Sequence, residues 1–262
     1  MSVSFTAIWI GGVSVKHQEY IRLVPGAKTA VLFIHGIMGT PDHFLALIPH
    51  VPRDWSVCNI LLPGHGKSVS DFGASSMDQW RSRANQVFDR LCQDHERVVL
   101  VAHSMGTLFS LQMASRCPEK VPFMFFLAPP MKICVKPAMV ANSLRVAFHC
   151  VREDNPRQTA TRDACSIQTS LKLWEYIPWI PRFLELFREV KDTQKLLPDM
   201  RVPCFVYVSG KDEMVSRKTA AIMKQSPTAI VHLLPDSCHF YYAPEDKAFL
   251  ISEFQKKCLE IT

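Results

Sequence analysis

The chain has 262 residues, of which 48% are hydrophobic and 21% charged, a balance typical of a soluble globular protein with a substantial core. This length fits one large α/β domain, or one domain that carries an insertion. The formal charge of +6 is spread along the chain, and no basic run is interleaved with aromatic residues. A solvated surface is therefore favoured over a nucleic-acid interface.

The cysteines and the N-terminus both favour a reducing compartment. Nine cysteines without any C-x-x-C pair predict free thiols rather than a disulfide scaffold. The first ten residues lack the basic and apolar regions of a signal peptide. No apolar run approaches the ~18 residues that a membrane helix needs. We therefore expect a soluble, cytoplasmic protein without stable membrane insertion, whose oligomeric state the sequence leaves open.

Strands and helices are expected to alternate in the first third of the chain. Residues 3–10 and 13–24 predict two strands around a Gly-Gly turn, and residues 30–34 predict a buried strand. Thr40 and Pro41 have the residue types of a helix cap and first turn, ahead of apolar residues at helical spacing. A strand over 57–62 and a helix from Met77 follow.

The stretch 97–117, RVVLVAHSMGTLFSLQMASRC, joins a buried strand to a helix through Ser104. Small residues two positions before and after a serine, at a sharp strand-to-helix turn, are typical of a nucleophile elbow. The expected pattern is G-x-S-x-G. Here Gly106 holds the second glycine position and Ala102 replaces the first. The position of the motif between strand and helix makes Ser104 the candidate nucleophile.

The rest of the chain, after residue 117, predicts further buried strands and one excursion from the sheet. Strands are expected over 122–130, 204–212 and 230–239, and a C-terminal helix begins at Pro244. Between them, residues 132–198 show no strand and carry several aromatic residues at helical spacing. Such a segment either packs against the main domain or forms a lid over an apolar substrate pocket, and both roles are compatible.

A serine nucleophile needs a base that an acid orients. Since sites in α/β sheets form beyond the carboxyl ends of the strands, Asp212 and His239 are the candidates, each just after a strand. Their chain order of Ser, Asp, His fits this architecture. Glu213 competes with Asp212 but precedes a turn. The other histidines are interpreted as structural, namely His232 on a strand, His65 in a loop and His103 at the elbow.

Two backbone N–H groups are expected to form an oxyanion hole. The Met105 N–H follows the nucleophile at the start of a helix, and the Ile37 N–H lies in the loop after the strand at 30–34. Metal chemistry is not supported, since no His or Cys cluster has zinc spacing, and no nucleotide-binding loop is present. Cys238 is interpreted as the small residue that the turn before His239 requires.

With these residues identified, the chain resembles the α/β-hydrolase family over nearly its whole length. The motifs that carry the likeness are HGIMGTP at 35–41, PGHGKS at 63–68, AHSMG at 102–106, SGKDEMV at 209–215 and SCHF at 237–240. They look most like those of small carboxylesterases and monoacylglycerol lipases. Ala102 and Thr107 depart from the family pattern, in which glycines often stand at both positions.

The resemblance implies a mostly parallel, eight-stranded sheet with helices on both faces. Residues 1–131 and 199–262 would form the core and 132–198 a helical cap. Substrate would contact Gly36, Met38, Trp174 and Trp179, and no cofactor is implied. We expect a serine esterase of short- to medium-chain or monoacylglycerol-like esters. An acyl thioesterase, a carbon–carbon bond hydrolase and a non-catalytic small-molecule-binding protein of the same fold stay open.

Overall fold

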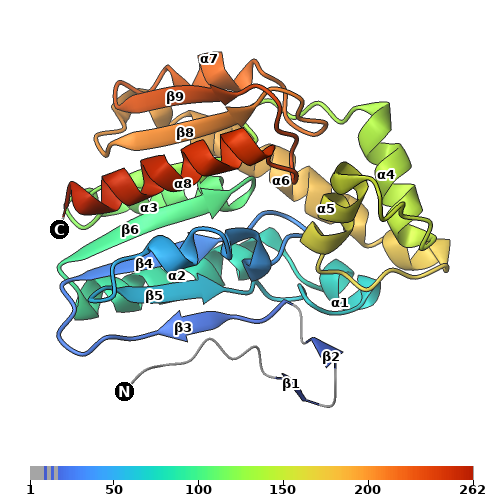
Figure 1. Ribbon diagram of the computed structural model, residues 1–262, viewed down its shortest axis with the longest axis horizontal. Helices are drawn as coiled ribbons and strands as arrows, with labels where there is room; N and C mark the ends of the chain where they lie inside the picture. Colours follow the sequence, from blue (N-terminus) through green and yellow to red (C-terminus); the bar gives the residue numbers. More distant parts are fainter. Residues whose placement is uncertain (1–8, 11–12, 15–16, 262) are drawn as a thin grey trace.

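A computed structural model describes residues 9–10, 13–14 and 17–261. Within these residues the main sheet has seven strands in the order β3-β5-β4-β6-β7-β8-β9 (Figure 1). Only β3 runs antiparallel to its neighbour, and all other pairs are parallel. Their bounds are β3 Tyr20–Arg22, β4 Thr29–Ile34, β5 Ser56–Ile60, β6 Arg97–His103, β7 Met124–Leu127, β8 Cys204–Ser209 and β9 Ala229–Leu234.

Alternate residues of the central strands supply two separate cores, one on each face of the sheet. On β4, Leu32 and Ile34 pack in one core while Val31 and Phe33 pack in the other. The first core includes residues of α2 Met77–Asp94, α3 Gly106–Arg116 and α6 Trp179–Gln194, and the second includes α8 Pro244–Leu259. Figure 1 shows α8 in front of the sheet and α3 behind it. A parallel sheet buried on both faces explains the continuous apolar runs of these strands.

The N-terminal strands differ from the sequence expectation. The described part of the first strand, β1 Trp9–Ile10, pairs with β2 Val13–Ser14 in a separate two-stranded sheet, and its other residues lie outside the described ones. The run 13–24 is not one strand, since His17 has a positive φ of 67° between β2 and β3. The main sheet therefore has seven strands where the family resemblance implied eight.

Two helical segments also differ from expectation. Thr40 caps a helical turn with Pro41 at its first position, as predicted, but the segment forms two 3-10 turns, η1 Pro41–Phe44 and η2 Ile48–His50, in place of one α-helix. Pro49 and Pro52 explain this, because they lack the N–H that a continuous α-helix requires. Two short helices were not predicted from the sequence. One is α1 Val69–Ala74, which begins at a capping box between Ser68 and Asp71, and the other is α7 Thr219–Met223.

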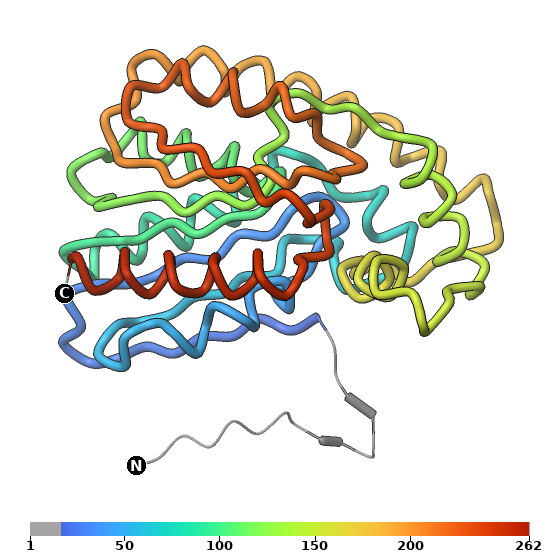
Figure 2. The backbone as a smooth tube through the Cα atoms, turned by 45° about the horizontal axis from the view of Figure 1, so that its top comes forward, coloured from blue at the N-terminus to red at the C-terminus, as the bar shows by residue number. Residues whose placement is uncertain are grey.

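The segment between β7 and β8 is helical, with α4 Pro137–Ala147, α5 Pro156–Ala164, η3 Leu173–Tyr176, α6 and η4 Leu197–Asp199. Figures 1 and 2 show α4, α5 and the start of α6 together beyond one end of the sheet. The second half of α6 returns to the core, where buried Glu189 pairs with Arg81 of α2. No helix in the described part of the chain is long and apolar enough to cross a membrane.

Candidate active site

Ser104 lies at the turn between β6 and α3, with the left-handed backbone of a nucleophile elbow. Its φ is +48°, and its N–H donates to the Leu127 carbonyl at 2.9 Å. The turn leaves no room for a side chain at Gly106, where a Cβ would lie 2.2 Å from the Ile34 carbonyl oxygen. Ala102 is fully buried within β6, so the methyl group that replaces the usual glycine is accommodated in the core.

Asp212 and His239 form a buried hydrogen-bonded pair beyond the ends of β8 and β9. His239 Nδ1 lies 2.9 Å from Asp212 Oδ2, and both side chains are 2% exposed. A carboxylate only accepts, so Nδ1 carries the proton and Nε2 is left to act as a base. Asp212 Oδ1 accepts from the Met214 and Val215 N–H groups at 2.7 Å each. These bonds fix the carboxylate, which in turn fixes the imidazole ring.

His103 joins the elbow to the loop that carries His239. Its Nε2–H donates to the His239 carbonyl at 3.1 Å, and the two rings lie 4.8 Å apart. Since Ser104 is the next residue after His103, the nucleophile candidate and the base candidate lie in adjoining segments. Although 135 positions separate these residues in the chain numbering, the fold brings them to one rim of the sheet.

The loop after β4 approaches the elbow closely. A Cβ at Gly36 would lie 2.8 Å from the Ser104 Cβ, so only glycine fits there. Ile37 and Met105 are buried, and neither backbone N–H donates a hydrogen bond to any residue that the structure describes. Buried N–H groups are rarely left without an acceptor. Two of them beside a serine are suited to hold a developing oxyanion.

Two neutral histidines hold this loop, and the sequence analysis did not assign them that role. His35 Nε2 accepts from the Leu62 N–H at 3.1 Å while its Nδ1–H donates to the Gly36 carbonyl at 2.8 Å. His65 Nε2 accepts from the Met38 N–H at 3.1 Å. Burial lowers the pKa of His35 to about 4 and that of His65 well below its usual range, so both can keep an acceptor nitrogen at neutral pH.

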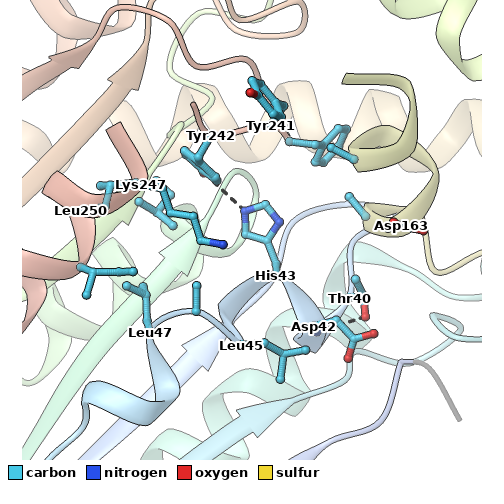
Figure 3. A pocket seen from close by; sticks show the side chains of 16 residues that line it. Thr40, Asp42, His43, Leu45, Leu47, Asp163, Tyr241, Tyr242, Lys247 and Leu250 are labelled. Atoms are coloured by element: carbon cyan, nitrogen blue, oxygen red, sulfur yellow. Dashed lines mark hydrogen bonds between the residues drawn. The ribbon is translucent and has the colours of Figure 1, made fainter. Parts of the chain in front are cut away.

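His103 also packs against the half-buried His43, with the two rings tilted. The His43 ring lies 3.9 Å from the His103 ring, and His43 Nε2 faces the Tyr242 hydroxyl at 3.4 Å (Figure 3). Burial, with the neighbouring His239, lowers the pKa of His43 to about 3, and burial also lowers the pKa of His103 well below its usual range. A cavity of about 550 Å³ opens beside His43, between α5 and α8.

An apolar cavity of about 100 Å³ lies between the loop after β4 and the helical segment 132–198. It is lined by Met38, Met139, Ser143, Val146, Ala147, Thr161, Cys165, Thr169, Tyr176, Trp179 and Phe240. Met38 follows Ile37, and Phe240 follows His239, so the cavity adjoins the candidate site. Of the residues expected to contact substrate, Met38 and Trp179 line this cavity and Gly36 contacts the elbow. Trp174 does not line it and is 66% exposed.

Glu213 and Lys136 are further residues of the site that the sequence analysis did not assign. Glu213 Oε2 accepts from the His239 N–H at 3.2 Å, and the Glu213 carbonyl accepts from the Lys136 N–H at 2.7 Å. Lys136 Nζ donates to the Asp212 carbonyl at 2.5 Å. The chain entering α4 is therefore bound to the loop that carries the acid candidate. Adjacency of Glu213 to Asp212 was the only sequence signal for this role.

The described residues contain neither a disulfide nor a cluster of side chains suited to bind a metal ion. All nine cysteines are free, as expected, and Cys238 is buried beside His239. No group of three or more His, Cys, Asp or Glu side chains in the described part of the chain is arranged to hold a metal ion. His232 lies on β9 and stacks on Tyr207, which confirms its structural interpretation.

Comparison with known proteins supports a hydrolase relationship. A family model described as serine aminopeptidase, S33, matches residues 25–239. A curated relative from Cupriavidus necator, the dihydrolipoyllysine-residue acetyltransferase component of an acetoin cleaving system, is 30% identical over 120 residues. That match covers 46% of this chain and 30% of the relative, so the chain aligns with less than a third of the relative's length.

Solved structures share the fold over almost the whole chain. One, from work on the metagenome-derived lipolytic enzymes LipS and LipT, has a TM-score of 0.72 at 17% identity and covers 94% of this chain and 98% of its own. Another, the monoacylglycerol lipase of Paleococcus ferrophilus, has a TM-score of 0.65 at 13% identity and covers 94% and 99%. The α/β-hydrolase fold and the resemblance to esterases and monoacylglycerol lipases are thereby confirmed.

Proposed function

The chain belongs to the S33 serine aminopeptidase family, and we propose that within this family it is a serine hydrolase that cleaves carboxylic esters through an acyl-enzyme. The observation that carries the proposal is the Asp212–His239 pair at 2.9 Å, in a loop that is hydrogen-bonded through His103 to the elbow carrying Ser104. An oriented imidazole next to a serine hydroxyl is the arrangement that activates a nucleophile.

In the proposed reaction, Ser104 Oγ attacks the ester carbonyl carbon while His239 Nε2 takes the hydroxyl proton. Asp212 stabilises the imidazolium that forms. The carbonyl oxygen becomes an oxyanion, and the N–H groups of Ile37 and Met105 bind it. His239 then returns the proton to the departing alkoxide, which leaves as the alcohol. Water, deprotonated by the same histidine, attacks the acyl-enzyme and releases the acid and free Ser104.

The lining of the apolar cavity favours an ester over the N-terminal residue of a peptide. An aminopeptidase binds a free α-ammonium group, and a carboxylate is the partner that such a buried cation requires. None of the described residues that line the cavity carries a carboxylate. We propose that Met38, Trp179 and Phe240 instead contact the apolar part of an ester, with the segment 132–198 as the cap over it.

The size of the cavity supports a short acyl group. A volume of about 100 Å³ lies well below the roughly 300–1,000 Å³ of pockets that hold drug-sized ligands. In a series of p-nitrophenyl esters and monoacylglycerols, we expect kcat/KM to be highest for short to medium acyl chains. The same protein should turn over alanine p-nitroanilide, an aminopeptidase substrate, far more slowly. Turnover of matched acyl thioesters measures the thioesterase alternative.

Ser104→Ala tests the assignment of the nucleophile. We expect a loss of about 10⁴-fold or more in kcat on a p-nitrophenyl ester. Ser110→Ala is the matched control, since Ser110 is a buried serine on α3 whose hydroxyl donates to the Gly106 carbonyl. Parental turnover by the Ser104 variant would show that another group performs the reaction, or that the activity is not enzymatic.

A further inference from the structure

The cap turns a row of apolar side chains toward solvent on α4. Val140, Leu144 and Phe148 lie four residues apart, so they share one side of the helix. Phe148 is 54% exposed and the other two are half exposed. Other residues of the same helix, Met139, Ser143, Val146 and Ala147, line the apolar cavity. One helix therefore borders both the substrate cavity and an exposed apolar surface.

A second exposed apolar row lies on η3 and α6, whose Tyr176 and Trp179 line the same cavity as α4. Leu173 is 73% exposed, and Ile177, Ile180 and Leu184 are each exposed by more than half. The last two lie four residues apart on α6, and the first two lead into that helix. In Figures 1 and 2, α4 and the start of α6 form the margin of the molecule beyond the end of the sheet. Large exposed apolar patches of this kind mark interaction sites.

The charge of these segments indicates which kind of partner the apolar surface would bind. Residues 132–148 and 170–188, which carry both rows, contain six basic residues and two acidic ones, Glu175 and Glu185. The formal net charge of these two segments is therefore +4, against +6 for the whole chain. Arg145 and Arg188 are exposed; Arg145 directly follows Leu144, and Arg188 lies four residues after Leu184 on α6. Apolar side chains surrounded by cations suit a membrane surface with anionic headgroups.

We propose that this face of the cap, defined by Val140, Leu144, Phe148, Leu173, Ile177, Ile180 and Leu184, docks onto an anionic lipid surface. The apolar residues enter the headgroup region while Arg145 and Arg188 pair with lipid phosphates. A helix is about 10 Å in diameter, so docking places the apolar cavity within about that distance of the lipid. A second copy of this chain is disfavoured because both faces would carry the same positive charge.

Vesicle binding tests the docking without reference to catalysis. The Ser104→Ala protein is sedimented with vesicles of phosphatidylcholine alone, or of phosphatidylcholine with about one third phosphatidylglycerol. We expect binding to the anionic vesicles that weakens as salt is raised. Phe148→Ser combined with Leu173→Ser should lower this partition by about tenfold or more. Arg145→Gln combined with Arg188→Gln should lower it severalfold on anionic vesicles only.

The matched control is Leu23→Ser combined with Leu259→Ser. Both leucines are as exposed as those of the cap but lie at the start and the end of the chain. We expect this control to bind as the parent does, and melting temperatures check that every variant is folded. Absent vesicle binding, or equal loss in the control, overturns the proposal. So does a dimer, seen by sedimentation velocity, that the Phe148→Ser, Leu173→Ser variant dissociates, because that face then binds a second copy.

Discussion

Asp212→Asn should abolish turnover while leaving the fold intact, because the surroundings of Asp212 determine how the amide must lie. Oδ1 accepts two backbone N–H groups at 2.7 Å, from Met214 and Val215. An asparagine keeps both bonds only if its carbonyl oxygen occupies the Oδ1 position. Its NH₂ group then faces His239 Nδ1 at the distance of 2.9 Å now spanned by the carboxylate bond. In the reverse orientation, the NH₂ group would face the Met214 and Val215 N–H groups, which are donors as well.

The amide introduced by Asp212→Asn therefore stabilises the tautomer of His239 that cannot act as a base. Nδ1 must accept, the ring proton moves to Nε2, and the nitrogen facing the elbow can no longer take a proton from Ser104. We expect kcat on a p-nitrophenyl ester to fall by about 10⁴-fold, as this exchange does in serine proteases. The melting temperature should change little, since the two backbone bonds persist. Activity within tenfold of the parent would refute the role of Asp212, and Glu213→Gln is the matched control.

Three further outcomes follow from the same geometry. Glu213→Ala should lower kcat by about tenfold with KM unchanged, because the His239 N–H loses its acceptor. Glu213→Gln keeps an amide oxygen that can accept this bond, so it should have the parental rate. An equal loss of kcat in both variants would contradict a positioning role for Glu213. The buried histidines bind fewer protons folded than unfolded, since burial lowers their pKa, to about 4 for His35 and about 3 for His43. The free energy of unfolding, measured by urea titration, is therefore expected to fall as pH drops from about 6.5 toward 4. In His43→Phe, the slope of this free energy against pH should be smaller by up to about 1.4 kcal/mol per pH unit. Gly106→Ala should strongly lower soluble yield and melting temperature because its Cβ meets the Ile34 carbonyl, whereas Ala102→Gly should cost about 1 kcal/mol of stability and keep the activity.

Local chemistry explains what the sequence could predict. The buried run ending at His103, followed by Ser104 and then Gly106, favours a strand that turns sharply into a helix, and the structure has this turn. Asp212 and His239 were identified because the carboxyl ends of parallel strands meet at one rim. The hydrogen bond that joins them depends on ring and carboxylate orientation, which no residue pattern encodes.

Contacts between distant segments explain what the sequence could not predict. His65 was interpreted as a loop residue and His35 was given no role, yet each accepts an N–H from a position 27 residues away. Trp174 has the residue type of a pocket lining, but its place in η3 turns it to solvent. The capping box at Ser68 and Asp71 was visible in the sequence and would have identified α1.

Covalent labelling of the serine tests the central claim most directly. Treatment with a fluorophosphonate, followed by peptide mass spectrometry, should give one adduct on Ser104. The adduct should be absent from Ser104→Ala and should form far more slowly in His239→Ala, because the hydroxyl then lacks its base. An unlabelled Ser104 in the folded parent protein, or labelling that His239→Ala leaves unchanged, would contradict an activated nucleophile at this elbow.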